Sequence, residues 1–245
     1  LSATRTQGDL ISRGVFSWPS VVRWEHFVDA WNTGGFTDYF RNSLLLIVVK
    51  VPLGLLIASL AAYPLAKMRF GGSGWVFVYF LIGLAVPVQV TLQPLLVMMK
   101  QLGIANSLAA LVPPYIAFGL PFGIFLMQAF FEDLPRELSD AGRVDGCSEW
   151  RIFHSIMLPL AWPAVSTLIV FQFVRTWNEF LMPLLYLQNE DLRPVPLGLM
   201  FFQGAYTRDT GLISAGVTIA LLPVVIIYLI FQRQFVKGLT AGAVK

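Results

Sequence analysis

The chain has 245 residues, of which 56% are hydrophobic and only 13% are charged, and its mean hydropathy is +0.69. Soluble domains carry about 25% charged residues. A soluble core cannot take up so much apolar surface, so the composition predicts a multi-spanning membrane protein. The net charge of +3 is too small to indicate nucleic-acid binding, and the single cysteine, Cys147, excludes an internal disulfide.

Residues 1–41 are mixed in polarity, and no charged-then-apolar signal peptide opens them. The sequence has no initiator methionine, so we expect it to begin part-way into the natural protein. Tryptophan favours the headgroup level of a membrane, and this stretch holds three: Trp18, Trp24 and Trp31. We predict an extracytoplasmic N-terminal segment, 1–41, followed by a transmembrane domain, 42–245.

Five apolar stretches follow, and each is long enough to cross a bilayer, for which about 20 apolar residues suffice. We therefore predict an all-α integral membrane protein with five transmembrane helices in this chain. They are expected at about 42–68, 75–99, 108–131, 158–187 and 211–231.

Three features inside these stretches have structural interpretations. Pro113-Pro114 is expected to kink the third helix rather than to form a site. Gly119 and Gly123, four residues apart, are typical of close packing between helices. Lys50 lies near the start of the first helix, where we expect its long side chain to extend to the outer surface rather than to line a pore.

Basic residues in short loops indicate the orientation, since they gather on the cytoplasmic side. One side would hold eight of them: Lys67, Arg69, Arg136, Arg143, Arg151, Arg233, Lys237 and Lys245. The other side would hold three: Lys100, Arg193 and Arg208. This asymmetry predicts that the loop before the fourth helix and the C-terminus are cytoplasmic.

That loop, 134–163, is the longest polar segment between apolar stretches in the second half of the chain. Pro135 can open a helix, Asp145-Gly146 signals a turn, and Ser148 can begin a second helix. The pattern predicts two short helices joined at Gly146, each apolar on one side. From the residues alone, this could be an amphipathic helix on the membrane surface or a docking element for a soluble partner.

Spacing within this loop resembles the "EAA" loop of bacterial ABC-importer permeases, which runs E-A-A, three residues, Gly, nine residues, I-x-L-P. The matching positions are Asp140, Ala141, Gly142, Asp145, Gly146, Ile156, Leu158 and Pro159. The resemblance implies that these residues couple the chain to an ATPase through a cytoplasmic helix-turn-helix, 132–160. Two positions depart, with Asp140 for Glu and Gly142 for Ala. The glycine weakens a helix by roughly 1 kcal/mol relative to alanine.

The resemblance extends over 42–245 and is closest to the smaller permease of maltose-type carbohydrate importers. It is carried by Arg41-Asn42-Ser43, Ala61-Ala62-Tyr63-Pro64, Arg69-Phe70-Gly71-Gly72, Gln101-Leu102-Gly103, Pro135-Arg136-Glu137-Leu138, Trp177-Asn178-Glu179-Phe180 and the ending Gly238–Lys245. Such permeases have six spans, which implies a first span upstream of this sequence. Their partners are a second, homologous permease, two copies of an ABC ATPase and an extracytoplasmic sugar-binding protein, in the bacterial inner membrane.

No catalytic motif stands out in the sequence. Gly71-Gly72-Ser73-Gly74 lacks the lysine of a phosphate-binding loop, and His26 and His154 lack metal-ligand spacing. We expect no enzyme activity, metal or cofactor, with ATP and Mg²⁺ bound by the partner ATPase. The alternative function is an ion-gradient-driven secondary transporter or channel, which usually shows internal repeats, and none is evident here.

Four residues of the fourth apolar stretch form a candidate translocation path: Arg175, Trp177, Asn178 and Glu179. Charged residues within a membrane usually face protein or water, because exposure to lipid is costly. Arg175 and Glu179 are four apart, so a continuous helix would place them on one face. They could form an ion pair that only orients the helix. Alternatively, with Trp177 and Asn178, they could offer stacking and hydrogen-bonding groups to a sugar.

Overall fold

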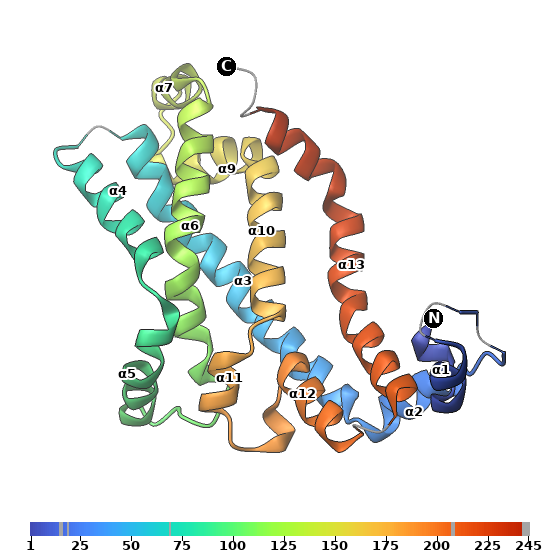
Figure 1. The fold of residues 1–245 in the computed structure, drawn as a ribbon. Helices are drawn as coiled ribbons and strands as arrows, with labels where there is room; N and C mark the ends of the chain where they lie inside the picture. The colour runs from blue at the N-terminus through green and yellow to red at the C-terminus, as the bar shows by residue number, and fades with distance from the viewer. Residues whose placement is uncertain (15–16, 19, 69, 207–208, 242–245) are drawn as a thin grey trace. The chain divides into compact units, whose positions relative to one another are not determined.

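The computed structural model describes residues 1–14, 17–18, 20–68, 70–206 and 209–241, and all regular secondary structure in these ranges is helical (Figure 1). The all-α fold predicted from composition is confirmed. Arg69 and Arg208 of the basic-residue comparison, and the last four residues of the C-terminal ending, lie outside the described ranges.

Three segments in the described ranges are single helices long and apolar enough to cross a membrane. They are α3 (Phe36–Lys67), η3 (Leu108–Ala110) with α6 (Val112–Asp133), and the part of α13 (Thr210–Ala241) up to Gln232. Two further helix pairs qualify if each bent pair is taken as one span, which gives five. The five predicted spans correspond to these five segments. The first helix begins at Phe36, six residues earlier than expected.

The predicted second span is not one continuous helix. It consists of α4 (Ser73–Ile82), η2 (Gly83–Ala85) and α5 (Val88–Gln101), with a 98° bend between Ala85 and Val88. Val86 is extended, and Pro87 has no N–H to continue the hydrogen-bond ladder. The chain therefore breaks its helix within the apolar stretch.

The predicted fourth span is wrong at both ends. A helix begins well before it, made of α8 (Glu149–Ile152), the π-helical η4 (Phe153–Met157) and α9 (Leu158–Leu160). After a 77° bend, α10 covers only Trp162–Trp177. A short helix, α11 (Leu181–Tyr186), follows separately. Pro159 and Pro163 flank the bend, where each lacks a backbone donor.

The chain divides into two compact units, the first made of 1–47, 96–111 and 176–227. Besides parts of longer helices it holds η1 (Ser2–Thr4), α1 (Gln7–Arg13), α2 (Glu25–Thr33), α11, η5 (Glu190–Leu192) and α12 (Val195–Ala205). Its apolar core is formed by Ala3, Ala30, Phe36, Phe202, Leu212, Ala215 and Ile219. The sequence did not predict α12, whose 11 residues are too few to cross a bilayer.

Two polar residues at the start of the first span organise a loop of this unit. The Asn42 side-chain amide donates to the carbonyl oxygens of Asp191 and Arg193, at 2.7 and 3.1 Å. The Ser43 hydroxyl accepts a hydrogen bond from the backbone N–H of Val195, at 2.9 Å. Since both side chains are buried, they satisfy backbone groups that would otherwise lack partners.

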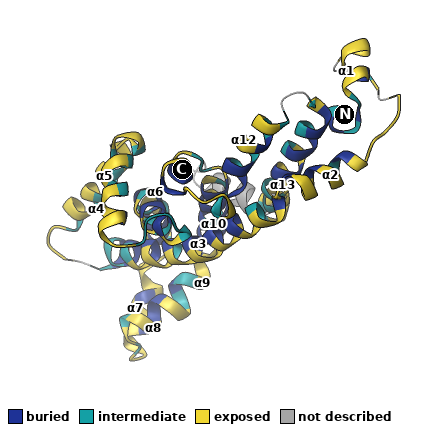
Figure 2. Ribbon diagram, turned by 90° about the horizontal axis from the view of Figure 1, so that it is seen from below, coloured by how far each residue is buried: buried dark blue, intermediate teal, exposed yellow. Residues whose placement is uncertain are grey.

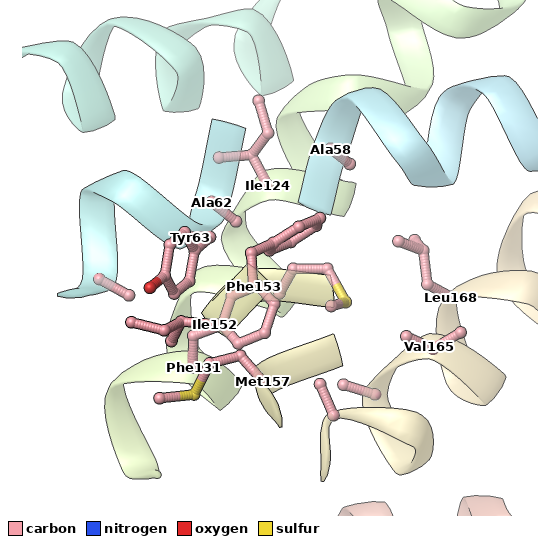
Figure 3. Close-up of a cluster of buried hydrophobic side chains, with 14 residues drawn as sticks. Ala58, Ala62, Tyr63, Ile124, Phe131, Ile152, Phe153, Met157, Val165 and Leu168 are labelled. Atoms are coloured by element: carbon pink, nitrogen blue, oxygen red, sulfur yellow. The ribbon is translucent and has the colours of Figure 1, made fainter. Parts of the chain in front are cut away.

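The second unit comprises 48–95, 112–175 and 228–245. Its core joins buried residues of α3, α6, the α8–α9 helix and α10, several of which appear in Figure 3. Figure 2 shows that α4 and α5, by contrast, are mostly exposed, and no residue of α4 is buried. Only part of this unit therefore packs as an interior.

Small residues let the helices of this unit approach closely. A Cβ added at Gly123 would lie 3.0 Å from the Ala58 Cβ and 3.5 Å from a methyl carbon of Leu168. A Cβ at Gly119 would lie 2.8 Å from the Gln172 amide. The close-packing interpretation of this glycine pair is confirmed.

The proline pair of the third span does not kink it. Pro113 and Pro114 occupy the first turn of α6, which begins at Val112. Backbone N–H groups there have no partner within the helix, so proline costs no hydrogen bond. The predicted kink at these residues is wrong, and only Pro121 lies in the interior of α6.

We expect Gly123→Ala to destabilise the protein, although alanine usually favours a helix over glycine by about 1 kcal/mol. The Ala58 methyl cannot rotate away, so α3 and α6 have to separate, and overpacking typically costs about 1–3 kcal/mol. Gly54→Ala is the matched control, since it lies in α3 with nothing within 4 Å of its added Cβ. Thermal unfolding in detergent should show a lower midpoint for Gly123→Ala alone. Equal midpoints for the two variants would contradict the tight contact.

Candidate functional site

The polar loop folds into two helices joined by a turn, as predicted. The first, α7 (Arg136–Val144), starts after Pro135. Gly146 follows with φ +75°, a left-handed conformation that favours glycine. Ser148 then caps α8, its hydroxyl accepting from the backbone N–H of Arg151 at 3.4 Å.

Gly142 is the contact point between the two helices. It is buried, and an added Cβ would lie 3.0 Å from Ile152 Cγ1 and 3.2 Å from Ile156 Cδ1. The smallest residue therefore gives α7 its close approach to the following helix. This contact accounts physically for glycine at a position where the resembling motif has alanine.

The eight residues that match the resembling motif divide between an exposed side and a packed side. Asp140, Ala141, Asp145, Gly146 and Pro159 are exposed, whereas Gly142 is buried and Ile156 and Leu158 are half-buried. Figure 2 shows exposed and buried positions alternating along α7 and α8. The acidic residues are thus available to a partner, and the apolar ones hold the helix pair together.

A network of charged groups crosses the turn. Arg143 Nε donates to Glu149 Oε1 and its Nη1 to Asp140 Oδ1, both at 2.7 Å. The Tyr63 hydroxyl donates to Glu149 Oε2 at 2.9 Å. The Arg143 guanidinium holds the pKa of the Glu149 carboxyl below its usual range, against the opposing effect of partial burial. Because this pKa is lower in the folded protein than in the unfolded chain, the network stabilises the fold at neutral pH. That stabilisation is lost as the pH falls through the folded pKa of Glu149.

Sequence reasoning found Asp140 but missed Tyr63, Arg143 and Glu149 as interacting residues. Tyr63 and Glu149 are 86 positions apart, so no local spacing relates them. The i, i+3 separation of Asp140 and Arg143 on a polar helix was a signal that could have identified that pair.

A hollow of about 440 Å³ borders α7. Its lining mixes three cations with one acid: Lys67, Met68, Arg136, Ser139, Asp140 and Arg143. The polar loop therefore offers both an exposed helix and an adjoining concave surface to a partner.

The candidate path residues occupy different environments. Trp177 is only 2% exposed, its indole N–H donating to the Ala220 carbonyl at 3.1 Å and its ring contacting Phe40 edge-on. Asn178 is exposed, and Glu179 Oε1 accepts from the backbone N–H of Met182 at 3.2 Å. Since α10 ends at Trp177, no continuous helix carries Glu179 on the face of Arg175.

Two cationic side chains of the second unit lie against neighbouring helices. Arg175 Nη1 donates to the Phe118 carbonyl at 3.0 Å. Lys50 is 1% exposed and bonds to the side chain of Gln172, whose amide donates to the Gly119 carbonyl at 3.1 Å. The prediction that Lys50 extends to the outer surface is therefore wrong. Burial among α3, α6 and α10 supplies it with a polar partner instead.

Among the described residues, no three His, Cys, Asp or Glu side chains come together in a way that could hold a metal ion.

The fold matches that of an ABC transporter chain. One matching solved structure is that of a bacterial ABC transporter involved in the import of the acidic polysaccharide alginate. Its chain and this one superpose with a TM-score of 0.79 and share 21% sequence identity. The match covers 95% of this chain and 86% of that one. At this identity the match establishes the fold of the chain.

Residues 50–240 match the family described as binding-protein-dependent transport system inner membrane component, and the chain belongs to this family. It is 36% identical over 245 residues to the probable ABC transporter permease protein YurM of Bacillus subtilis, covering 81% of that protein. It is also 34% identical over 249 residues to the arabinooligosaccharides transport system permease protein AraQ of Halalkalibacterium halodurans, covering 88% of it. Both matches cover 100% of this chain.

We expect Gly142→Leu to loosen the helix pair, because the side chain would have to displace Ile152 and Ile156. Limited proteolysis of the detergent-purified protein should then cut the 134–148 segment on the order of tenfold faster, as about 1.4 kcal/mol of lost packing would allow. Ala141→Leu, at the adjacent exposed position, is the matched control and should be cut at the native rate. Equal protection of both variants would show that the contact at Gly142 does not hold the loop.

Proposed function

We propose that this chain is the membrane-spanning permease subunit of an ATP-driven carbohydrate importer and forms half of its translocation path. The observation that carries the proposal is the family match over 50–240, which includes an exposed helix-turn-helix at the spacing of the coupling motif. The AraQ relative, named for arabinooligosaccharides, supports an oligosaccharide as the substrate class. The ion-gradient alternative has no comparable support.

The proposed partners are a second, homologous permease, two copies of an ABC ATPase and an extracytoplasmic sugar-binding protein. The family description, which is binding-protein-dependent, supports the last of these. ATP and Mg²⁺ would be bound by the ATPase, and this chain would need no cofactor of its own.

In the proposed orientation, α7 and the C-terminus face the cytoplasm and residues 1–41 lie outside. The excess of basic residues around α7 supports this orientation. ATP-driven closure of the ATPase subunits would displace α7 and α8, and the spans would then tilt between inward-open and outward-open states. The exposed carboxylates of Asp140 and Asp145 would face the ATPase.

For the path we retain Arg175, Trp177, Asn178 and Glu179 as proposed residues, with divided roles. Exposed Asn178 is the group that could meet a sugar directly. Trp177 is buried, so its role would be to hold the adjacent turn in place.

Asp140→Lys should leave membrane insertion normal and lower uptake by about tenfold or more, because losing one partner of a charge pair at an interface costs about 2–5 kcal/mol. Its own ion pair with Arg143 lies on the surface and contributes at most about 1 kcal/mol to stability. The measurement is import of labelled arabino-oligosaccharides or alginate oligosaccharides into proteoliposomes that hold the complete complex.

Glu190→Lys is the matched control for that substitution. Glu190 is also an exposed acid paired with an arginine three residues later, Arg193, at 3.0 Å, but it lies on η5. Import should remain normal in this variant. Normal import by Asp140→Lys would exclude the docking role, and failure of the ATPase to co-purify with the native chain would exclude the proposed function itself.

Asn178→Ala should lower import several-fold per assembled complex, since an amide that bonds a neutral partner contributes about 0.5–1.5 kcal/mol. Trp177→Phe should instead lower the yield of assembled complex, because it removes the bond to the Ala220 carbonyl and leaves a small void. Asn32→Ala, at an exposed position of α2, is the control. Import and the amount of assembled complex are measured on the same preparations. Normal import by Asn178→Ala would remove this residue from the path.

A further inference from the structure

The last turn of α3 holds the helix-turn-helix at two points. One is the hydrogen bond from the Tyr63 hydroxyl to Glu149 Oε2, at the start of α8. The other is the hydrogen bond from the Lys67 ammonium to the carbonyl of Leu134, which lies between α6 and α7. Tyr63 and Lys67 are four residues apart in one helix, so they lie on the same face. The polar loop is therefore attached to α3 at the start of α8 and at the segment that leads into α7.

Packing fixes the direction of the Tyr63 side chain. Tyr63 is 4% exposed, and its ring lies edge-on to Phe131 of α6 and tilted against Phe153 of η4, with centroids 5.9 and 5.4 Å away. Figure 3 shows these three rings together, with the tyrosine oxygen pointing out of the cluster. Because the ring is packed on two sides, its hydroxyl has a fixed direction, and it points to the Glu149 carboxylate.

Glu149 connects this hydroxyl to the exposed helix. Its second oxygen accepts from Arg143, which also bonds Asp140. A continuous chain of four side chains thus runs from α3 to the exposed acid of α7. Hydrogen bonds to charged groups are stronger than neutral ones and hold their partners in a narrow geometry.

We propose that Tyr63 and Lys67 are positioning residues that transmit displacement of α7 and α8 to α3, with Glu149 and Arg143 completing the link on the cytoplasmic side. The inference rests on the proposed function, since it assumes that an ATPase moves α7. Because α3 is a single helix from Phe36 to Lys67, movement of its last turn acts on a whole span. Without the two attachments, only the apolar packing of the following helix would connect the loop to α3.

The decisive variant is Tyr63→Phe, which removes one oxygen and keeps the packed ring. It should fold, because the Glu149 side chain is 40% exposed and keeps its ion pair with Arg143, so water can replace the hydroxyl. Tyr79→Phe is the matched control, as Tyr79 also contacts a phenylalanine, Phe80, but lies on α4 with 74% exposure.

The measurement is the number of ATP molecules hydrolysed per sugar imported by the complete reconstituted complex. The sugar is the oligosaccharide that the native complex imports. For Tyr63→Phe we expect this ratio to rise on the order of tenfold, as loss of one hydrogen bond to a charged group allows, with normal assembly and thermal stability. A merely structural role would lower both rates together and leave the ratio unchanged. Tyr79→Phe should keep the native ratio.

Further variants test whether the contacts act as one unit. Lys67→Met keeps an unbranched side chain but loses the bond to Leu134, and should also raise the ratio. If Tyr63 acts through Glu149, Tyr63→Phe combined with Glu149→Leu should be no worse than Glu149→Leu alone.

An unchanged ratio in Tyr63→Phe would overturn the proposal, as would fully additive effects in the double variant. Failure of the native complex to import any sugar probe, or to bind an ATPase, would instead contradict the proposed function. The two failures are therefore distinguishable in one set of preparations.

Discussion

Burial of Ile152, Phe153 and Met157 against α3 and α6 is the contact on which the arrangement of this protein depends. These residues are at most 3% exposed, and they belong to the same helix that carries the polar Glu149. The hydrophobic effect thereby fixes a charged helix pair to the end of apolar helices. A loop held only by its polar groups would exchange those contacts for water at little cost.

Small residues bring helices close together at two places in the second unit. Gly123 and Ala58 bring α6 against α3, and Gly142 brings α7 against the following helix. In each case the chain accepts the lower helix propensity of glycine, about 1 kcal/mol, in exchange for packing contacts that a larger side chain would prevent.

The sequence predicted what depends on local pattern. Composition indicated the membrane class, apolar length located the spans, and Asp145-Gly146 with Ser148 located the turn. It did not reveal the attachment of Tyr63 to Glu149 or of Lys50 to Gln172, because partners 86 and 122 positions apart leave no periodic signal. It also gave continuous spans where the structure has bends, since hydropathy reports whether a segment is apolar and not whether its backbone is unbroken.

Those bends carry a consequence for assembly. At the break between η2 and α5 the backbone leaves the helical ladder, and Leu84 and Val86 beside it are 52% and 42% exposed. Irregular backbone facing lipid does not occur within the hydrocarbon region, because its polar groups would lack partners; it is tolerated only against protein or a water-filled cavity. If this segment spans the membrane, the break must therefore be covered by another subunit or face the translocation path. The proposed pairing with a second permease would supply either of these surroundings, whereas a single chain in lipid would supply neither.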